Sequence, residues 1–445
     1  EMLRSLVGSE MCIRDRSYIA ITIVTRWCIL NAHPNTNPST MQNPNQHLSH
    51  SHIEAHTEAH TEIELDSFAP RILTWFDHSG RHDLPWQQHQ LDTPDPYPVW
   101  LSEIMLQQTQ VATVIPYFER FMASFPTVQD LANASWEQVA EHWAGLGYYA
   151  RARNLHKGAK QLVDIIEQTG KFPQTVAHWE QISGVGQSTA GAIVAMGVRA
   201  DQYGGDRGVI CDGNVKRVLT RWAGIDGDIT KTATTKALWQ LAERLTPNRD
   251  SGHYAQAMMD MGATLCTKAK PACLLCPVQA DCVANAQGKQ SFYPVKSKKS
   301  PNPSKFSLAL KLVCDDKTLW LQRPDTGIWG GLWCLPLAFV KKQQGAKNTE
   351  APLLATWQQE STFEAEYNTA EQIIFAFLQA EQLLNIQQVN LDSPDTVKHS
   401  LTHFHWFLTP ITMTLTIEQG MRLTQALQQA LQTLSWVDDS AQNSL

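Results

Sequence analysis

The spacing of apolar residues along the chain divides it into two regions with different predicted structures. From Phe68 to about Asn285, apolar residues recur at intervals of three and four, with interruptions at Pro, Gly and Asp-Gly. This pattern is typical of helices joined by turns. After Phe306, apolar and polar residues alternate, as in SLALKLV and TLWLQRP, which predicts strands. We therefore expect a multidomain protein, with an all-α domain over residues 67–288, a linker over 289–305 and a smaller α+β domain over 306–445.

Residues 1–66 are expected to have no fold. The stretch SLVGSEMCIRDR looks like translated adapter or vector sequence, so we take Met41 as the natural start. Five histidines separated by polar residues then predict a disordered, solvated tail. The apolar run Tyr18–Val24 is far shorter than the roughly 20 residues that cross a bilayer. The sequence thus predicts a soluble protein with no membrane partner.

Charge is unevenly distributed along the chain, whose formal net charge is -7. Residues 67–305 carry 24 Lys and Arg against 21 Asp and Glu, a net charge of +3, so the remaining residues carry -10. The helical domain is therefore compatible with a local basic surface that binds phosphates.

Four of the nine cysteines occur within 17 residues, in the pattern C-x6-C-x2-C-x5-C. Soft thiolate ligands at this density suit one metal centre, and the spacing alone favours zinc and a [4Fe-4S] cluster equally. Two disulfides are a weaker alternative, because the other five cysteines are scattered singly. The candidate ligands are Cys266, Cys273, Cys276 and Cys282.

Two carboxylates stand in unusual surroundings. At helical spacing, Glu103 has mainly apolar neighbours, which should raise its pKa. Asp212 precedes Gly-Asn-Val and an apolar periodic run, which by itself predicts a helix N-cap. Such a cap can also leave one carboxylate oxygen facing a cleft.

Two glycine-containing stretches predict contacts to nucleic acid. ISGVGQSTAGAI, residues 182–193, places Gly184 and Gly186 between two helical patterns, where backbone N–H groups could bind a phosphate, although most such turns only join helices. GLGYYARARN, residues 145–154, combines two tyrosines with two arginines, as expected of a surface that stacks on bases and pairs with phosphates. Considered alone, the two tyrosines would more often belong to a core.

Seven motifs occur in one order: LPWQ (84–87), SEIMLQQTQVATVIPYF (102–118), GLGYYARARNLH (145–156), GVGQSTAGAI (184–193), DGNVKRVL (212–219), AMMDMGATLC (257–266) and the cysteine pattern. Together they resemble the endonuclease III superfamily of helix-hairpin-helix DNA glycosylases, and within it the MutY-type adenine DNA glycosylases. The resemblance covers roughly residues 68–285 and, more loosely, 306–437. It implies two helical lobes around a DNA-binding cleft, and one [4Fe-4S] cluster on the four cysteines.

The resemblance also implies a reaction. Glu103 would be the general acid that protonates adenine, and an ionised Asp212 would stabilise the oxocarbenium-like sugar. Relatives that also cut the strand carry a lysine where this chain has Ser188, so base excision alone is expected. The implied substrate is duplex DNA with adenine opposite 8-oxoguanine or guanine, acted on by a monomer in the bacterial cytoplasm, at the nucleoid.

Further site residues follow from the same resemblance. Those near the extruded base are Trp86, Gln87 and Gln256. Those expected to contact DNA, the first four near the opposite base, are Gln108, Thr109, Leu146, Tyr148, Gly184, Gly186, Ser188 and Lys216.

The second domain resembles a Nudix fold but lacks the Glu-rich metal-binding helix of Nudix hydrolases, so it should bind without hydrolysing. Where the family reads 8-oxoguanine with Phe-Ser-His, this chain has Leu401, Thr402 and His403.

Two alternatives remain open at this point. One is a pyrimidine-lesion glycosylase with lyase activity, against which Ser188 and the second domain count. The other is a non-catalytic DNA-binding protein with a structural cluster. Loss of Glu103 or Asp212 would have favoured this alternative, but both carboxylates are present.

Overall fold

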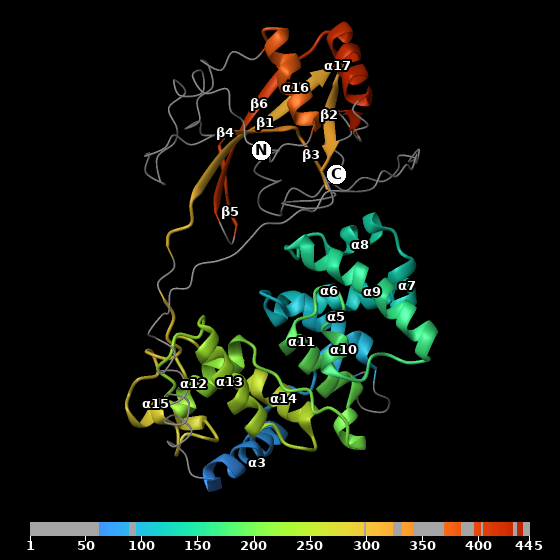
Figure 1. The fold of residues 1–445 in the computed structure, drawn as a ribbon. Coiled ribbons are helices and arrows are strands. Elements are labelled where there is room, and N and C mark those ends of the chain that lie inside the picture. The colour runs from blue at the N-terminus through green and yellow to red at the C-terminus, as the bar shows by residue number, and fades with distance from the viewer. Residues whose placement is uncertain are drawn as a thin grey trace, which may run out of the picture. The chain divides into compact units, whose positions relative to one another are not determined.

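The computed structural model of the protein describes residues 62–88, 95–297, 300–323, 332–340, 369–383, 396–401, 404–429 and 434–438. The chain divides after residue 298 into two compact units, one helical and one built around a sheet (Figure 1). This confirms the predicted fold class of an all-α domain followed by an α+β domain. Among the described residues, none of the helices is both long and apolar enough to cross a membrane.

The helical unit consists of α-helices with short 3-10 and π segments, labelled η (Figure 1). In chain order these are α3 (Glu62–Ser79), α4 (Pro85–Gln88), α5 (Pro96–Leu106), α6 (Val111–Ser124), α7 (Val128–Asn133), α8 (Trp136–Trp143), α9 (Tyr149–Thr169), α10 (Val176–Trp179), α11 (Gln187–Ala192), η1 (Ile193–Val198), η2 (Ala200–Tyr203), α12 (Gly213–Ala223), α13 (Thr232–Leu245), α14 (Ser251–Asp260), η3 (Met261–Leu265), η4 (Cys273–Leu275) and α15 (Val283–Ala286).

Both edges of this unit differ from the sequence-based expectation. Helix α3 begins at Glu62, inside the segment expected to be unfolded, and Arg244 of α13 forms ion pairs with Glu62 and Asp66. At the other edge, Tyr293 of the predicted linker is buried, and its hydroxyl donates a 2.6 Å hydrogen bond to Asp226. Residues 289–297 are therefore held against the helical unit.

Helix α5 lies in the core of the helical unit. Nine of its eleven residues are buried, because apolar side chains surround the helix instead of forming one stripe. Its start is capped by Asp95, whose carboxylate accepts a 3.0 Å bond from the N–H of Tyr97. Segment η1 packs so closely on α5 that a Cβ on Gly197 would lie 2.8 Å from the Cα of Pro96. The helix that carries Glu103 is thus rigidly enclosed.

The described residues of the second unit form a seven-stranded sheet and two helices. The strand order is β3-β2-β1-β6-β5, with β4 pairing β1 and β7 pairing β2. Strands β1 and β6 are parallel, in register from Ser304 opposite His405 to Val313 opposite Thr414, and all other pairs are antiparallel. The elements are β1 (Ser304–Cys314), β2 (Lys317–Gln322), β3 (Trp333–Cys334), β4 (Leu337–Val340), α16 (Thr369–Ala380), β5 (Val397–Ser400), β6 (His405–Thr414), α17 (Ile417–Gln429) and β7 (Leu434–Asp438).

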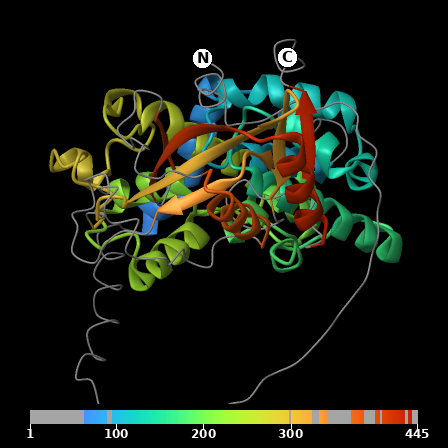
Figure 2. The same cartoon turned by 90° about the horizontal axis from the view of Figure 1, so that it is seen from above.

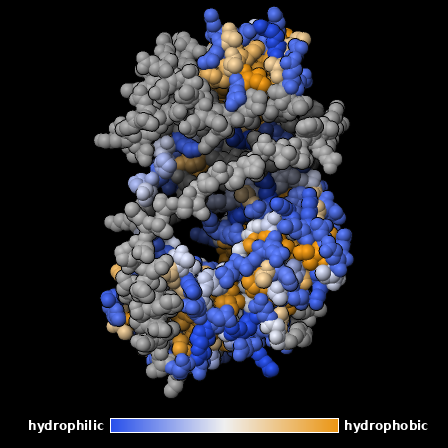
Figure 3. Space-filling view, in the orientation of Figure 1, coloured by the Kyte–Doolittle hydropathy of each residue, from blue (hydrophilic) through white to orange (hydrophobic). Residues whose placement is uncertain are grey.

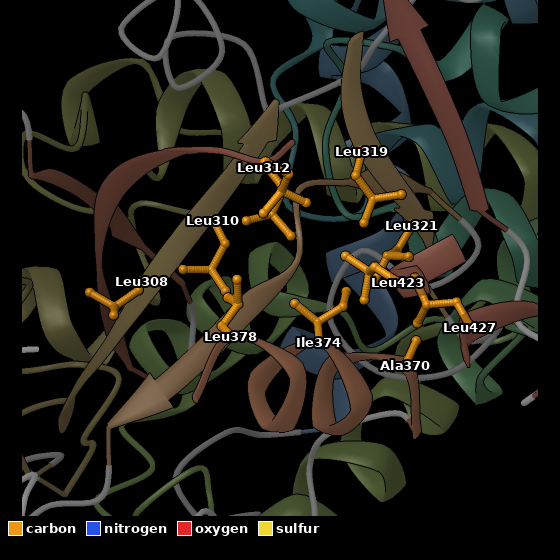
Figure 4. Close-up of a cluster of buried hydrophobic side chains, with 11 residues drawn as sticks. Leu308, Leu310, Leu312, Leu319, Leu321, Ala370, Ile374, Leu378, Leu423 and Leu427 are labelled. Atoms are coloured by element: carbon orange, nitrogen blue, oxygen red, sulfur yellow. The ribbon is translucent and has the colours of Figure 1, made fainter. Parts of the chain in front are cut away.

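Alternation along β1 separates two hydrophobic clusters. Leu308, Leu310 and Leu312 meet Ile374 of α16 and leucines of α17 (Figure 4). Ala309, which points to the other face, packs with Trp406 in the second cluster. Helices α16 and α17 therefore cover one face of this sheet, and both lie beside the strands in the second view (Figure 2).

Helix α16 carries one glutamate, Glu371. Its carboxylate is buried, lies 3.5 Å from Arg323 and accepts a 3.1 Å bond from the N–H of Leu337. The carboxylate of α16 thus fastens the helix to β4 and to the end of β2.

Candidate active site

The two predicted catalytic carboxylates are electrostatically coupled, although one lies on α5 and the other at the start of α12. Protein atoms surround the carboxyl of Glu103, which keeps only partial exposure. Burial, followed by the negative charge of Asp212, raises the pKa of Glu103 to about 8. Glu103 therefore holds a proton at neutral pH.

Asp212 is both an N-cap and a member of this pair. Its Oδ1 accepts a 2.8 Å bond from the N–H of Val215, in the first turn of α12. Burial raises the pKa of Asp212, while the N–H groups of Val215 and Asn214 and the cations Arg217 and Lys216 oppose that rise. Asp212 therefore caps α12 and at the same time raises the pKa of Glu103.

Ser188 connects the hairpin to the residue before Asp212. Its Oγ accepts a 3.0 Å bond from the N–H of Cys211. Two glycines permit this approach: a Cβ on Gly191 would lie 2.0 Å from the carbonyl oxygen of Val209, and one on Gly208 would lie 2.4 Å from the N of Ala195. The chain leading to Asp212 therefore lies directly on α11 and η1.

The two hairpin glycines differ. Gly184 has φ +81°, and a Cβ there would meet Asn154 at 2.7 Å. Gly186 is the N-cap of α11, and a Cβ there would point into open space. Gly184 is required by its backbone and its neighbour, whereas Gly186 leaves the start of α11 accessible.

The four cysteines lie on one loop after η3, each half-buried. Burial raises the pKa of Cys276 to about 12 and that of Cys282 to about 11, with further rises from the charges of the neighbouring thiolates. Arg221 donates to Cys266 Sγ at 3.3 Å and Gln290 to Cys273 Sγ at 3.9 Å. Within the described residues, His, Cys, Asp and Glu form no group of three or more placed to hold a single metal ion.

This donor set suits a sulfur-ligated cluster in its chemistry. All four candidate ligands are thiols, and N–H groups point at two of the sulfurs, as is usual around iron–sulfur centres. Arg217 connects this loop to the start of α12, where Asp212 lies, by donating to the carbonyl oxygens of Cys266 at 2.8 Å and Gly262 at 2.6 Å, and to Asn214 Oδ1 at 2.8 Å. The sequence reading missed Arg217, although it stands five residues after Asp212.

The predicted base-pocket residues are held by neighbours. Trp86 is buried, edge-on to Phe118. Gln87 Oε1 accepts a 3.2 Å bond from the N–H of Leu84. The buried Gln256 donates to Asp260 at 2.8 Å, and Asp260 also forms a 2.6 Å ion pair with Arg81.

Asp260 and Arg81 therefore join the segment that carries Trp86 and Gln87 to α14, which carries Gln256. The sequence reading missed both, and the available signal was one aspartate in the otherwise apolar run AMMDMG.

The residues expected near the opposite base lie on two turns. Gln108 and Tyr148 are exposed and have left-handed backbones, with φ of 60° and 54°. Leu146 is 6 % exposed, and Thr109 is half-buried. Gln108 and Tyr148 are thus accessible to solvent, whereas the side chain of Leu146 is buried.

The prediction that both arginines of GLGYYARARN pair with phosphates is wrong for Arg151. Its guanidinium is buried and donates to protein carbonyls, including Met105 O at 2.7 Å. Arg153 lies over the ring of Trp136, 4.8 Å from its centroid. Tyr149 is buried, so only Tyr148 of the tyrosine pair is displayed.

Known proteins resemble both units. Residues 101–244 match the HhH-GPD superfamily of base excision DNA repair proteins, and residues 308–444 match the NUDIX domain. With the fold described above, these matches define a helix-hairpin-helix base-excision repair protein with a C-terminal NUDIX domain.

The relatives define the family more narrowly. The adenine DNA glycosylase of Buchnera aphidicola subsp. Acyrthosiphon pisum is 36 % identical over 311 residues, which is 70 % of this chain and 82 % of the relative. The adenine DNA glycosylase of Buchnera aphidicola subsp. Schizaphis graminum is 37 % identical, and the match covers 60 % of this chain and 74 % of the relative. The human adenine DNA glycosylase is 38 % identical, and the match covers 61 % of this chain and 58 % of the relative. The chain belongs to the adenine DNA glycosylase family. It is a DNA glycosylase that removes adenine in base excision repair, and the predicted resemblance is confirmed.

Proposed function

We propose that this enzyme hydrolyses the N-glycosidic bond of adenine mispaired with 8-oxoguanine or guanine in duplex DNA. The observation that carries the proposal is the pairing of a protonated Glu103, with a pKa of about 8, with the capped Asp212. Glycosidic cleavage requires one carboxyl group that donates a proton and a second that stays ionised. Glu103 keeps its proton, and N–H donors and cations favour the ionised form of Asp212.

The reaction begins with adenine outside the duplex, since the glycosidic bond is inaccessible in the stack. Glu103 donates its proton to a ring nitrogen of adenine as the bond from C1′ to nitrogen breaks, and the bonding electrons leave with the base. Asp212, ionised, stabilises the positive charge that develops on the sugar. Water adds to C1′ and releases one proton, which restores Glu103.

Base excision occurs without strand cleavage in this proposal. A lyase needs an amine that attacks C1′, but position 188 carries a hydroxyl that already accepts from Cys211. The product is an abasic site, and the strand stays intact until alkali breaks it.

One [4Fe-4S] cluster is proposed as the cofactor, held by Cys266, Cys273, Cys276 and Cys282. When bound, it would cross-link the loop and fix the carbonyl of Cys266 that Arg217 contacts. Purified protein should absorb broadly near ~400 nm, as thiolate-bound iron–sulfur clusters do, and contain about four irons per chain. Stoichiometric zinc without iron would contradict this assignment.

The second unit is proposed to recognise 8-oxoguanine without hydrolysing nucleotides. Leu401 follows β5, and its N–H donates to the carbonyl of Phe404 at 2.9 Å. Thr402 and His403 lie outside the described residues. Nearby cations lie over aromatic rings, Lys305 over Phe404 and Lys398 over Phe407, and the basic groups at this end of the sheet favour a polyanion.

One assay separates this proposal from its alternatives. The full chain would be incubated with duplexes that carry adenine opposite 8-oxoguanine, adenine opposite guanine, or thymine glycol, and each product would be analysed with and without alkali. We expect alkali-dependent breaks at both adenines and none at thymine glycol, with elution as a monomer in gel filtration. Breaks at thymine glycol without alkali would favour a pyrimidine-lesion lyase.

A further inference from the structure

Arg151 occupies an unusual place in the helical unit. It lies in the first turn of α9 and is 9 % exposed. Its two terminal nitrogens contact acceptors in two separate places: the last turn of α5 with the turn that follows it, and the turn before α9. These acceptors are the carbonyl oxygens of Ile104 (3.1 Å), Met105 (2.7 Å), Gln107 (2.5 Å), Leu146 (3.3 Å) and Gly147 (3.1 Å) and Thr109 Oγ1 (3.2 Å).

The first turn needs such a donor because α5 ends without a glycine. The last carbonyls of a helix have no partner within it and must be satisfied from outside. Here Gln107 leaves the helix and Gln108 takes φ 60°, a conformation that is costly for a residue with a side chain. The cation of Arg151 satisfies these carbonyls and also interacts favourably with the negative end of the helix dipole.

The second turn is equally irregular. Gly145, Gly147 and Tyr148 all have positive φ, at 90°, 79° and 54°. The ring of Tyr148 lies 5.3 Å from the guanidinium of Arg151 and is 48 % exposed. One cation therefore holds two strained turns, and each turn displays one exposed side chain, Gln108 or Tyr148.

We propose that Arg151 is a positioning residue that fixes the turn 107–109 relative to the turn 145–148, so that Gln108 and Tyr148 meet DNA as one preorganised unit. The inference rests on the proposed function, since these two residues contact DNA only in that proposal. A planar guanidinium presents its N–H groups in a fixed fork, which a lysine ammonium cannot reproduce. Preorganisation of this kind lowers the ordering cost of binding.

The first test does not involve DNA. Amide hydrogen exchange would be compared between the full chain and Arg151→Lys in peptides that cover 104–110 and 144–150. Arg153→Lys is the matched control, because it changes an arginine on the same helix that lies over a ring. We expect exchange in both peptides to rise together by about tenfold in Arg151→Lys, as loss of charged hydrogen bonds predicts, and to stay unchanged in the control. A rise in only one peptide would overturn the inference.

The second test measures DNA binding in the Glu103→Gln background, so that the probe is not cleaved. The probe is a duplex with adenine opposite 8-oxoguanine. Thr109→Val removes one hydrogen bond of Arg151, that to Thr109 Oγ1. We expect Arg151→Lys to weaken binding about tenfold and Thr109→Val about threefold, within the range for lost hydrogen bonds.

A double variant decides whether the two residues act together. If Arg151 acts through the turn 107–109, adding Thr109→Val to Arg151→Lys should weaken binding no further. Additive losses would overturn the inference. Should Arg151→Lys not fold, hydrogen exchange of Thr109→Val decides the question: exchange should rise in both peptides, and a rise in 104–110 alone would overturn the inference. A full chain that binds mispaired and paired duplexes equally would refute the proposed function, yet the exchange experiment would still test the role of Arg151.

Discussion

The hydroxyl of Ser188 accepts a 3.0 Å hydrogen bond from the backbone N–H of Cys211, the residue immediately before Asp212. The segment 182–193 and the residue before Asp212 are thereby joined through one side chain, and Gly191 and Gly208 allow the close approach. A group placed at position 188 consequently lies close to Asp212, the residue proposed to stabilise the sugar. In the proposed mechanism, the identity of residue 188 should therefore affect the chemical outcome.

Ser188→Lys should introduce strand cleavage. The full chain should leave product strands intact until alkali is added, while the variant should cut a fraction of them and form a covalent adduct that borohydride traps. Ser188→Ala is the matched control, because it removes the bond to Cys211 without adding an amine. It should lose about 1 to 3 kcal/mol of stability, as an unsatisfied buried donor does, and gain no cleavage. Efficient cleavage by the unchanged chain would refute the assignment.

Glu103→Gln should abolish excision while leaving DNA binding nearly intact, because an amide cannot deliver a proton. General acids contribute about 10² to 10⁴ in rate, so we expect a loss in that range in single-turnover assays with adenine opposite 8-oxoguanine. Glu119→Gln, at an exposed position on α6, should retain normal activity. In the unchanged enzyme the rate should fall as pH rises through about 8, where Glu103 loses its proton. Near-normal excision by Glu103→Gln would remove Glu103 from the mechanism.

The same substitution should stabilise the protein at high pH. The pKa of Glu103 is about 8 in the folded chain against an ordinary 4.5, so the folded state retains a proton that the unfolded state has lost between these values. The contribution of Glu103 to the free energy of unfolding is fully present below pH 4.5 and is lost as pH rises through 8. Glu103→Gln should therefore raise Tm by about 3 °C or more at pH 8.5, the shift that roughly 1 kcal/mol causes in a domain of this size. Equal Tm differences at pH 4.5 and 8.5 would contradict the raised pKa.

Asp212→Asn should separate charge from capping. Asparagine can still accept the N–H of Val215, so α12 should keep its start, but the negative charge beside the sugar is lost. We expect excision to fall by about 10² to 10³, typical of losing one electrostatic contact in a transition state. Asp212→Ala should lose as much activity and an additional ~1 kcal/mol of stability from the cap. Comparing rates with thermal melts of the two variants tests the distinction.

Local pattern predicted the parts of this site that depend on local chemistry. The apolar neighbours of Glu103 indicated a raised pKa, and the Asp-Gly-Asn-Val run indicated a cap. The cap arises within one helical turn, whereas the charge of Asp212, which also raises the pKa of Glu103, comes from another helix and could not be inferred from the sequence around Glu103. Arg151 was misinterpreted for lack of tertiary information. Two positions along a helix differ by about 200°, so Arg151 and Arg153 could not both face outward, but only packing shows which one is buried. The start of α3 was likewise missed, since Arg244, far along the chain, holds Glu62.

Thr402 is proposed to contact the lesion, although this chain has Leu401, Thr402 and His403 where the family resemblance implies Phe-Ser-His. Ser400 of β5 pairs with His405 of β6 at the end of these two strands, and Thr402 lies outside the described residues. Thr402 keeps a β-hydroxyl that can bond to the edge of 8-oxoguanine, whereas Leu401 cannot stack on a base as an aromatic residue does. Losing one neutral hydrogen bond costs about 0.5 to 1.5 kcal/mol, roughly two- to tenfold in binding.

Thr402→Ala should therefore narrow the preference for adenine opposite 8-oxoguanine over adenine opposite guanine by that factor, chiefly by weakening affinity for the lesion. Thr412→Ala, at an exposed position on β6, should leave the preference unchanged. Deleting residues 306–445 should narrow it much further while sparing some excision opposite guanine, because both carboxylates lie in the helical unit. The measurement is the ratio of single-turnover rates and of Kd for the two duplexes. A truncated chain that discriminates as well as the full chain would leave lesion recognition to the helical unit alone.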